Sequence, residues 1–221
     1  MSIKYHDLNV GVTLGGGGGG GGNVDPQYEI AGFHGAIAGD SSASLSCAVS
    51  GSTGAKCLLV IMHRSEITSI SNGMTLVHKT GDGWQWISVY EKVMQADSET
   101  YVITLASSAR VCAASVLTSA ETSVTYSGKI DAVSASNLAL TIPPQNRVTL
   151  IAFSDGYNGN KRLPSGRYVY CLPAMTSASA WRLCVAVVNN VKSFTLSNSS
   201  SPTADIYNNY HAYLFTLERQ S

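Results

Sequence analysis

The sequence predicts an all-β protein, a jelly-roll-like β-sandwich with an extended N-terminal arm. Three observations support this fold class. Apolar and polar residues alternate in many short runs, clusters of Gly, Asn, Ser and Asp separate the runs, and no segment shows a helical period. Many short strands at close spacing are typical of a sandwich or barrel. A chain of 221 residues can bury such a core without a metal or disulfides.

The chain divides into a docking arm (1–14), a glycine-rich linker (15–26) and a β-sandwich domain (27–221). One face of the arm strand carries Leu8, Val10, Val12 and Leu14. The linker holds eight consecutive glycines, which offer no side chains to a core and reach roughly 26–29 Å when extended. Because so short a strand is unstable alone, we expect it to pair with a neighbouring subunit or with the particle that carries the protein.

Within the main domain, strand-like runs recur at short intervals, and no internal repeat is apparent in the residues. Residues 84–89 have the pattern of a strand covered on both faces, whereas residues 100–105 alternate cleanly. We place strands near 43–49, 56–63, 74–80, 84–94, 99–106, 109–118, 121–126, 137–142, 147–154, 167–172, 181–188, 193–198 and 210–218.

Charged residues make up only 13% of the chain, about half of the usual share. The 14 basic and 14 acidic residues balance, and no basic run could neutralise a row of phosphates, so we expect no nucleic-acid partner. Apolar runs such as 57–62 are far below the roughly 20 residues of a membrane-spanning helix, so we expect no membrane insertion. The N-terminus lacks the apolar region of a secretion signal, which favours synthesis in a cytoplasm.

The five cysteines are odd in number and several lie in apolar runs, so we expect free, buried thiols. They are Cys47, Cys57, Cys112, Cys171 and Cys184. No Cys-x-x-Cys pair supports a zinc or redox motif. A hydroxyl-rich exterior suits an extracellular protein, but thiols suit cytoplasmic folding. A virion protein that is assembled inside a host and released by lysis satisfies both.

Four segments, Cys57–Ser65, Gly73–Val77, Trp86–Lys92 and Val102–Ala113, resemble a pattern of modules in tail-fibre, receptor-binding and other virion proteins of tailed bacteriophages. This resemblance implies a β-sandwich displayed on the virion in multiple copies, with no catalytic residues to carry over. A chain of this length leaves no room for a fibrous shaft, so a tail tip, a tail accessory protein or a capsid decoration protein fits better.

We therefore expect a structural protein of a bacteriophage virion, displayed on the particle surface and anchored through its N-terminal arm. The alternative is a tail adhesin module that binds a host receptor or carbohydrate. Expected partners are other virion proteins and further copies of the chain, a trimer being one open state; the alternative adds a host surface glycan.

Catalytic chemistry has little support, so we expect no enzyme, no cofactor and no metal. His63, Asp82 and a serine could form a triad on paper, but no Gly-x-Ser-x-Gly elbow is present. The loop 155–161 faintly resembles a calcium loop, yet it lacks the order and the terminal Glu of an EF-hand, and an Asn-Gly turn is favoured. Carboxylates near expected strand ends single out no pair for glycoside cleavage; these are Glu66, Asp82, Glu91, Asp97 and Glu99.

Two loops combine an aromatic ring with amide side chains, a combination that suits sugars and protein interfaces. Most other aromatic residues are expected to pack within the fold. The candidate ligand-binding residues are Tyr157, Asn158 and Asn160 in the first loop, and Tyr207, Asn208 and Asn209 in the second.

Overall fold

The structure is a computed structural model, and it confirms an all-β, antiparallel fold. The residues it describes are 28–35, 42–81, 85–131, 140–142, 148–155, 161–162, 170–171, 182–188, 194–198 and 211–219. The docking arm and the glycine linker lie outside these residues. Among the described residues the only helical element is one short 3-10 turn, η1 (Ser71–Gly73).

Eight strands occupy the first half of the described chain: β1 (Tyr28–Gly35), β2 (Ser42–Ser50), β3 (Lys56–His63), β4 (Ile67–Ile70), β5 (Thr75–Gly81), β6 (Trp86–Val93), β7 (Ser98–Ala109) and β8 (Val111–Thr118). Eight more follow: β9 (Thr122–Asp131), β10 (Leu140–Ile142), β11 (Val148–Asp155), β12 (Lys161–Arg162), β13 (Tyr170–Cys171), β14 (Arg182–Val188), β15 (Phe194–Asn198) and β16 (His211–Arg219).

Each of the predicted runs overlaps one of these strands, although parts of some runs lie outside the described residues, and three strands were not predicted. β4 and β12 are too short to show a period. β1 has no regular alternation because a bulge at Ala31 breaks its register against β8, next to Gly32. Local pattern thus finds most of the described strands.

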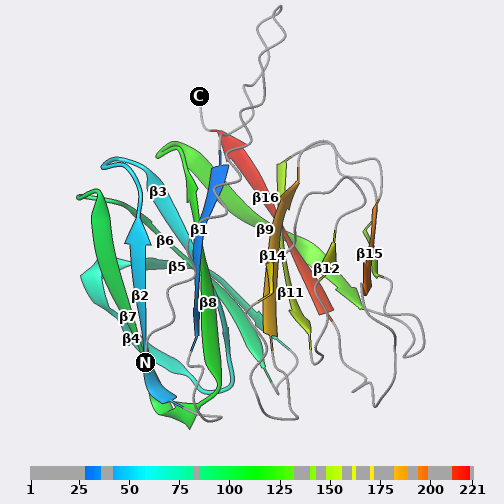
Figure 1. The fold of residues 1–221 in the computed structure, drawn as a ribbon, viewed down its shortest axis with the longest axis horizontal. Coiled ribbons are helices and arrows are strands. Elements are labelled where there is room, and N and C mark those ends of the chain that lie inside the picture. Colours follow the sequence, from blue (N-terminus) through cyan, green and yellow to red (C-terminus); the bar gives the residue numbers. More distant parts are fainter. Residues whose placement is uncertain are drawn as a thin grey trace, which may run out of the picture.

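The described strands form four antiparallel sheets. Sheet A has the order β1-β8-β3-β6-β5, sheet B β2-β7-β4, sheet C β13-β14-β11-β16-β9, and sheet D β10-β15-β12. Figure 1 shows them as successive layers in the order B, A, C, D from left to right. Sheet A is therefore an inner layer, with another sheet on each side.

Two apolar cores lie on the two faces of sheet A. The A–B core includes Cys47, Leu59 and Ile103, whereas the A–C core includes Leu58 and Leu150. Successive residues of β3 point alternately into one core and the other, so the strand is buried from Cys57 to its end. The two-sided cover predicted for 84–89 is confirmed at residues 87–89, all of which are buried.

The strand order repeats after eight strands. Adding eight to each strand number of sheet A gives β9-β16-β11-β14-β13, which is the order of sheet C, and the same operation converts sheet B into sheet D. The first strand of each set also carries a bulge, at Ala31 in β1 and at Ser127 in β9. We call β1–β8 the N-terminal unit and β9–β16 the C-terminal unit.

The jelly-roll detail of the predicted fold is not confirmed. A jelly roll places its eight strands in two four-stranded sheets, and its fifth strand pairs with its fourth. Here β5 pairs with β6 through register pairs such as Thr75–Glu91, so the described sheets have five and three strands. The division of the chain into an arm, a linker and one sandwich domain stays a prediction.

Candidate functional site

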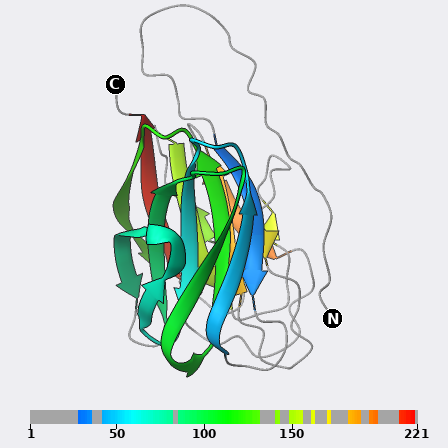
Figure 2. The ribbon, with the colours of Figure 1, turned by 90° about the vertical axis from the view of Figure 1, so that its left-hand side faces the viewer.

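The outer face of sheet B carries mainly small hydroxyl and methyl side chains. Alternation along β2 and β7 sends Leu45, Tyr101 and Ile103 into the A–B core and their neighbours outward. We call eight of the exposed residues the hydroxyl face: Ser44, Ser46, Ala48, Ser50, Ser98, Thr100, Val102 and Ala106. Figure 2 views the molecule from this side. Strand alternation alone thus creates a uniform outer surface.

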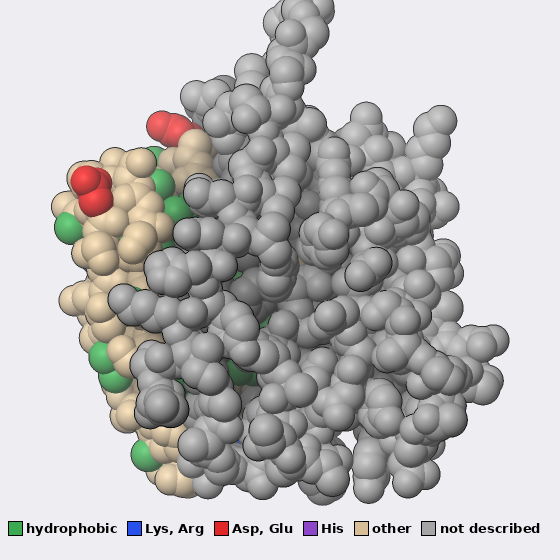
Figure 3. All heavy atoms as spheres, viewed as in Figure 1, with side chains coloured by type: hydrophobic (Ala, Val, Ile, Leu, Met, Phe, Trp, Pro, Cys, Tyr) green, Lys and Arg blue, Asp and Glu red, His purple; other side chains and the backbone are tan. Residues whose placement is uncertain are grey.

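Cross-strand pairing arranges the hydroxyl face in a regular array. Ser50 stands opposite Ser98, and Ser46 stands opposite Val102. The described outward positions of these two strands carry no charge. In Figure 3, where sheet B lies at the left edge, the described surface is mostly tan with apolar patches and acidic groups. Because a hydroxyl both donates and accepts, such a face can meet a neutral protein surface or a glycan without charge repulsion.

The 3-10 turn η1 continues the edge of sheet B beyond the end of β4. Ser71 Oγ accepts a hydrogen bond from the Val102 amide at 2.8 Å, and Asn72 Nδ2 donates to the Thr100 carbonyl at 2.7 Å. Asn72 has a φ of 61°, a left-handed conformation that Asn tolerates better than most residues. Side chains here satisfy ladder groups of β7 that another chain could otherwise bind.

A groove of about 400 Å³ lies where β5 begins and β6 ends. It is lined by Lys56, Gly73, Thr75, Glu91, Lys92, Val93, Gln95 and Ala120. Thr75 and Glu91 are register partners, so they stand side by side on one wall. The lining therefore offers hydroxyl, amide, ammonium and carboxylate groups within a short distance.

Both lysines of the groove are paired with carboxylates. Lys56 Nζ lies 3.4 Å from Glu91 Oε2, and it also donates to the Thr122 carbonyl. Lys92 Nζ lies 2.6 Å from the buried Glu99. These pairs compensate the charge, so the groove suits a neutral polar ligand better than an anion.

Glu99 accepts hydrogen bonds from three groups. Burial alone would raise its pKa, but hydrogen bonds from Lys92, the Gln95 amide and the Tyr101 hydroxyl outweigh burial and lower the pKa to about 2. Because Tyr101 belongs to the A–B core, this network closes one end of that core.

His63 closes the opposite end of the A–B core and is fully buried. Nδ1 must donate to the Ser65 carbonyl at 2.8 Å, so Nε2 accepts from the Ser88 hydroxyl, also at 2.8 Å. The ring stacks on Trp86, with centroids 5.7 Å apart. Burial lowers the pKa of His63, partly offset by the Ser65 bond, so the imidazole is neutral near pH 7.

The Ser88–His63 contact resembles half of a catalytic triad, but its position is structural. Ser88 is 1% exposed and lies within β6, so no substrate can reach its oxygen. Asp82, the third member of the triad considered from the sequence, lies outside the described residues. The pair therefore fills hydrogen bonds inside the fold.

The remaining carboxylates considered for catalysis have bonding partners of their own. Lys79 holds Glu66 at 2.5 Å through both carboxylate oxygens, and Asp97 accepts from the amide and hydroxyl of Thr53. These hydrogen bonds lower the pKa of both carboxyl groups. Neither group has the raised pKa of a general acid.

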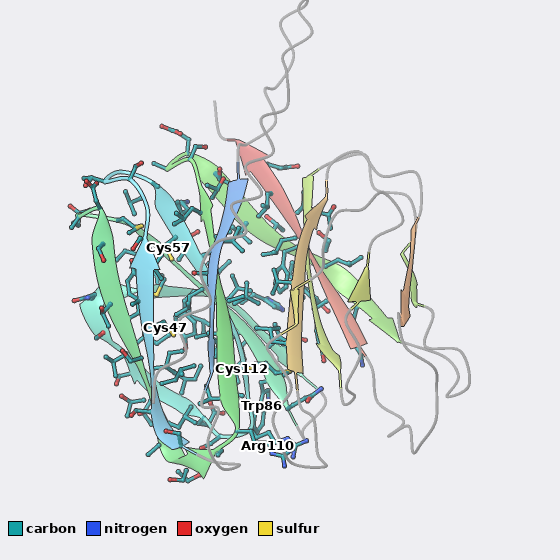
Figure 4. The ribbon with its side chains drawn as sticks, viewed as in Figure 1. Cys47, Cys57, Trp86, Arg110 and Cys112 are labelled. Atoms are coloured by element: carbon teal, nitrogen blue, oxygen red, sulfur yellow. The ribbon has the colours of Figure 1, made fainter. Side chains whose placement is uncertain are left out.

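Three of the five cysteines are free and buried, as predicted. Cys47 and Cys57 lie in the A–B core, and Cys112 lies in the A–C core (Figure 4). Burial raises the pKa of Cys47 and of Cys57 to about 12, so both stay as thiols. Cys171 and Cys184 are opposite each other in β13 and β14, and their side chains lie outside the described set.

Among the described residues, no three His, Cys, Asp or Glu side chains are placed to hold a metal ion. The described part of the chain also contains no helix long and apolar enough to cross a membrane. No family model matches the chain, and no match was found among curated proteins or among solved structures.

The residues that the sequence singled out for ligand binding and for assembly fall outside the described part of the chain. They are Tyr157, Asn158, Asn160, Tyr207, Asn208 and Asn209, and Leu8, Val10, Val12 and Leu14. The hydroxyl face was missed, although its signal was present in the polar positions of the runs 43–49 and 99–106. The groove had no signal in the sequence because it joins the ends of separate strands.

Proposed function

We propose that this protein is a structural protein of a bacteriophage virion, displayed on the particle surface and anchored through residues 1–14. The observation that carries the proposal is the hydroxyl face: a regular, uncharged outer sheet that is suited to protein and glycan contact over many copies. The low charge of the whole chain and the resemblance of its core strands to virion modules support the same proposal.

Purified particles test this proposal. Virions from a strain that encodes the chain should contain it at a fixed copy number, measured by quantitative mass spectrometry against the major capsid protein. A high copy number supports decoration, and a few copies per particle support a tail position. Absence from the particles, with the protein present in the lysate, would overturn the proposal.

The anchoring role of the arm is tested by removing residues 1–22. A glycine run cannot transmit packing, so the truncated protein should keep its β circular dichroism and its unfolding midpoint but lose attachment to particles. The matched control replaces Leu8 and Val10 by Ser and keeps the linker. Global unfolding of the truncated protein would falsify this separation of roles.

An adhesin that binds a neutral host glycan is the second candidate function, and the groove at β5 and β6 favours it. Its hydroxyl, amide and paired charges resemble the polar groups that bind sugar hydroxyls. We expect weak binding of the monomer to wall polysaccharide and stronger binding of intact particles, because copies act together. Gln95→Ala should weaken this binding if the groove is the site; the double change Tyr157→Ala, Tyr207→Ala should do so if the loops are.

A further inference from the structure

The two units correspond residue by residue through their pairing. In the N-terminal unit, Leu58 of β3 is opposite Val116 of β8. In the C-terminal unit, Leu150 of β11 is opposite Phe215 of β16. The two bulges fix this correspondence. Val116 pairs with the residue just before the β1 bulge, and Phe215 pairs with the residue just before the β9 bulge, so these two residues are equivalent. Their partners Leu58 and Leu150 are then equivalent. Two residues along, Val60 is equivalent to Ala152, and their partners Val89 and Val185 are equivalent as well. The units therefore share ladder positions as well as strand order.

Equivalent residues of the two units meet in one core. Leu58, Val89 and their equivalents Leu150 and Val185 are all fully buried in the A–C core. Each unit thus buries the same face of its five-stranded sheet against the other unit. A contact in which both partners use the same patch is the isologous contact of a two-fold dimer.

The stacking of the two sheets has the order that a two-fold axis requires. β8 lies beside β14, and β5 lies beside β9, where His78 stacks on Tyr126 with centroids 4.1 Å apart. β3 and β11 are the central strands of their sheets. Across the stack, the equivalent strands of sheet C therefore follow one another in the reverse of their order in sheet A. An axis through the centre of this stack therefore exchanges the two units.

We infer that the chain is a fused dimer: two copies of one eight-stranded unit that associate through their five-stranded sheets as subunits do. The partner that fits this face of either unit, once the units separate, is the opposite unit of a second copy of the chain. The connection between the units is short, since β8 ends at Thr118 and β9 begins at Thr122. One turn, in which Glu121 is the exposed residue, is all that makes the contact intramolecular.

The two faces have become complementary rather than identical. Small Ala114 in the N-terminal unit corresponds to the buried ring of Tyr213, and Val116 corresponds to Phe215. Two N-terminal units would leave the space of these rings empty, and two C-terminal units would crowd them. The N–C pairing is therefore the preferred one.

The experiment inserts a specific protease site between Ala120 and Glu121 of the full chain and cleaves the folded protein. The cleaved halves should remain together on gel filtration at micromolar concentration. Two cleaved preparations with different tags on each half should exchange partners, giving complexes that carry one tag from each preparation. The inference is overturned if the halves separate on cleavage, or if they also lose their β circular dichroism signal.

A pair of matched variants separates a subunit contact from one continuous core. Val89→Asp places a charge on the face between the units, and it should weaken the association of the cleaved halves more than tenfold while each half keeps its β circular dichroism. Val185→Asp, the equivalent change, should do the same. Val49→Asp, in the A–B core within one unit, should instead unfold that unit.

If Val89→Asp removes as much β structure as Val49→Asp, the units cannot exist apart and the inference fails. The inference also fails if the cleaved halves exchange no partners at any urea concentration below the one at which they begin to unfold. Retained exchange with weakening by only one of Val89→Asp and Val185→Asp would overturn the two-fold equivalence of the faces.

Discussion

Sheets A and B belong to the same unit, yet buried residues follow different patterns along their strands. In β7 of sheet B, buried and exposed residues alternate from Ser98 to Leu105, interrupted only by the intermediate Thr104. In β8 of sheet A, all eight residues are buried. The difference has one cause: sheet B has a core on one face, and sheet A has a core on each. The period of apolar residues therefore reports how many faces of a strand are covered.

The two cores also differ in their ends. The A–B core ends in polar networks around Glu99 and His63, whereas the A–C core joins the units through apolar side chains such as Leu58 and Leu150. The stability of the first core should depend on pH, and that of the second on volume and shape. Four predictions test this contrast, from the largest expected effect to the smallest.

Leu58→Ala should give the largest loss, because it opens a cavity between the units. Removal of a buried leucine side chain costs about 2–5 kcal/mol of unfolding free energy, measured by urea titration. The loss should reflect the lost volume, since apolar side chains surround the leucine in the A–C core. A loss below 1 kcal/mol would show that the sheets can close around the gap.

Glu99→Gln should cost about 1.5–3 kcal/mol at pH 7, the range for hydrogen bonds to a charged group. The folded pKa of Glu99 is about 2 and its ordinary value is 4.5, so the stabilisation is complete above 4.5 and is lost as pH falls towards 2. The variant should therefore approach the parent protein in acid. Parallel stability curves from pH 7 to pH 2 would contradict this assignment.

His63 should produce a smaller effect in a different pH window. Its folded pKa is lowered, so the unfolded chain binds the proton more readily and stability falls as pH drops below about 6.5. Thermal unfolding midpoints between pH 7.5 and pH 5 measure this slope. His63→Gln should reduce it, and the remaining slope should come from His78, whose pKa is also lowered by burial. An unchanged slope would place the titrating group elsewhere.

Val102→Thr should be nearly neutral, within about 0.5 kcal/mol, because the side chain is exposed on the hydroxyl face. The same measurement on Ile103→Thr, one residue along β7 and fully buried, should show a loss several times larger. Equal effects at the two positions would mean that another surface covers sheet B in solution.

The sequence predicted strands well because alternation is a local property. It missed the repeat because equivalent positions in the two sheets carry different residue types. Buried Val60 corresponds to Ala152, and Ser88 corresponds to Cys184. The inner position of sheet A was visible only as two-sided cover of residues 84–89. The groove could not be predicted, since Lys56, Thr75 and Gln95 are brought together only when β3, β5 and β6 pair.

The order of the two units along the chain has a consequence for synthesis on the ribosome. The N-terminal unit is complete at Thr118, about 100 residues before β16 ends. At about 5–20 residues per second, the apolar face of sheet A therefore waits roughly 5–20 s for its cover. During that time, neighbouring nascent chains on one polysome expose the same apolar face, and each face fits the C-terminal unit of any chain. A chaperone that covers this face, or wide spacing of ribosomes on the message, would therefore raise the yield of correctly paired molecules.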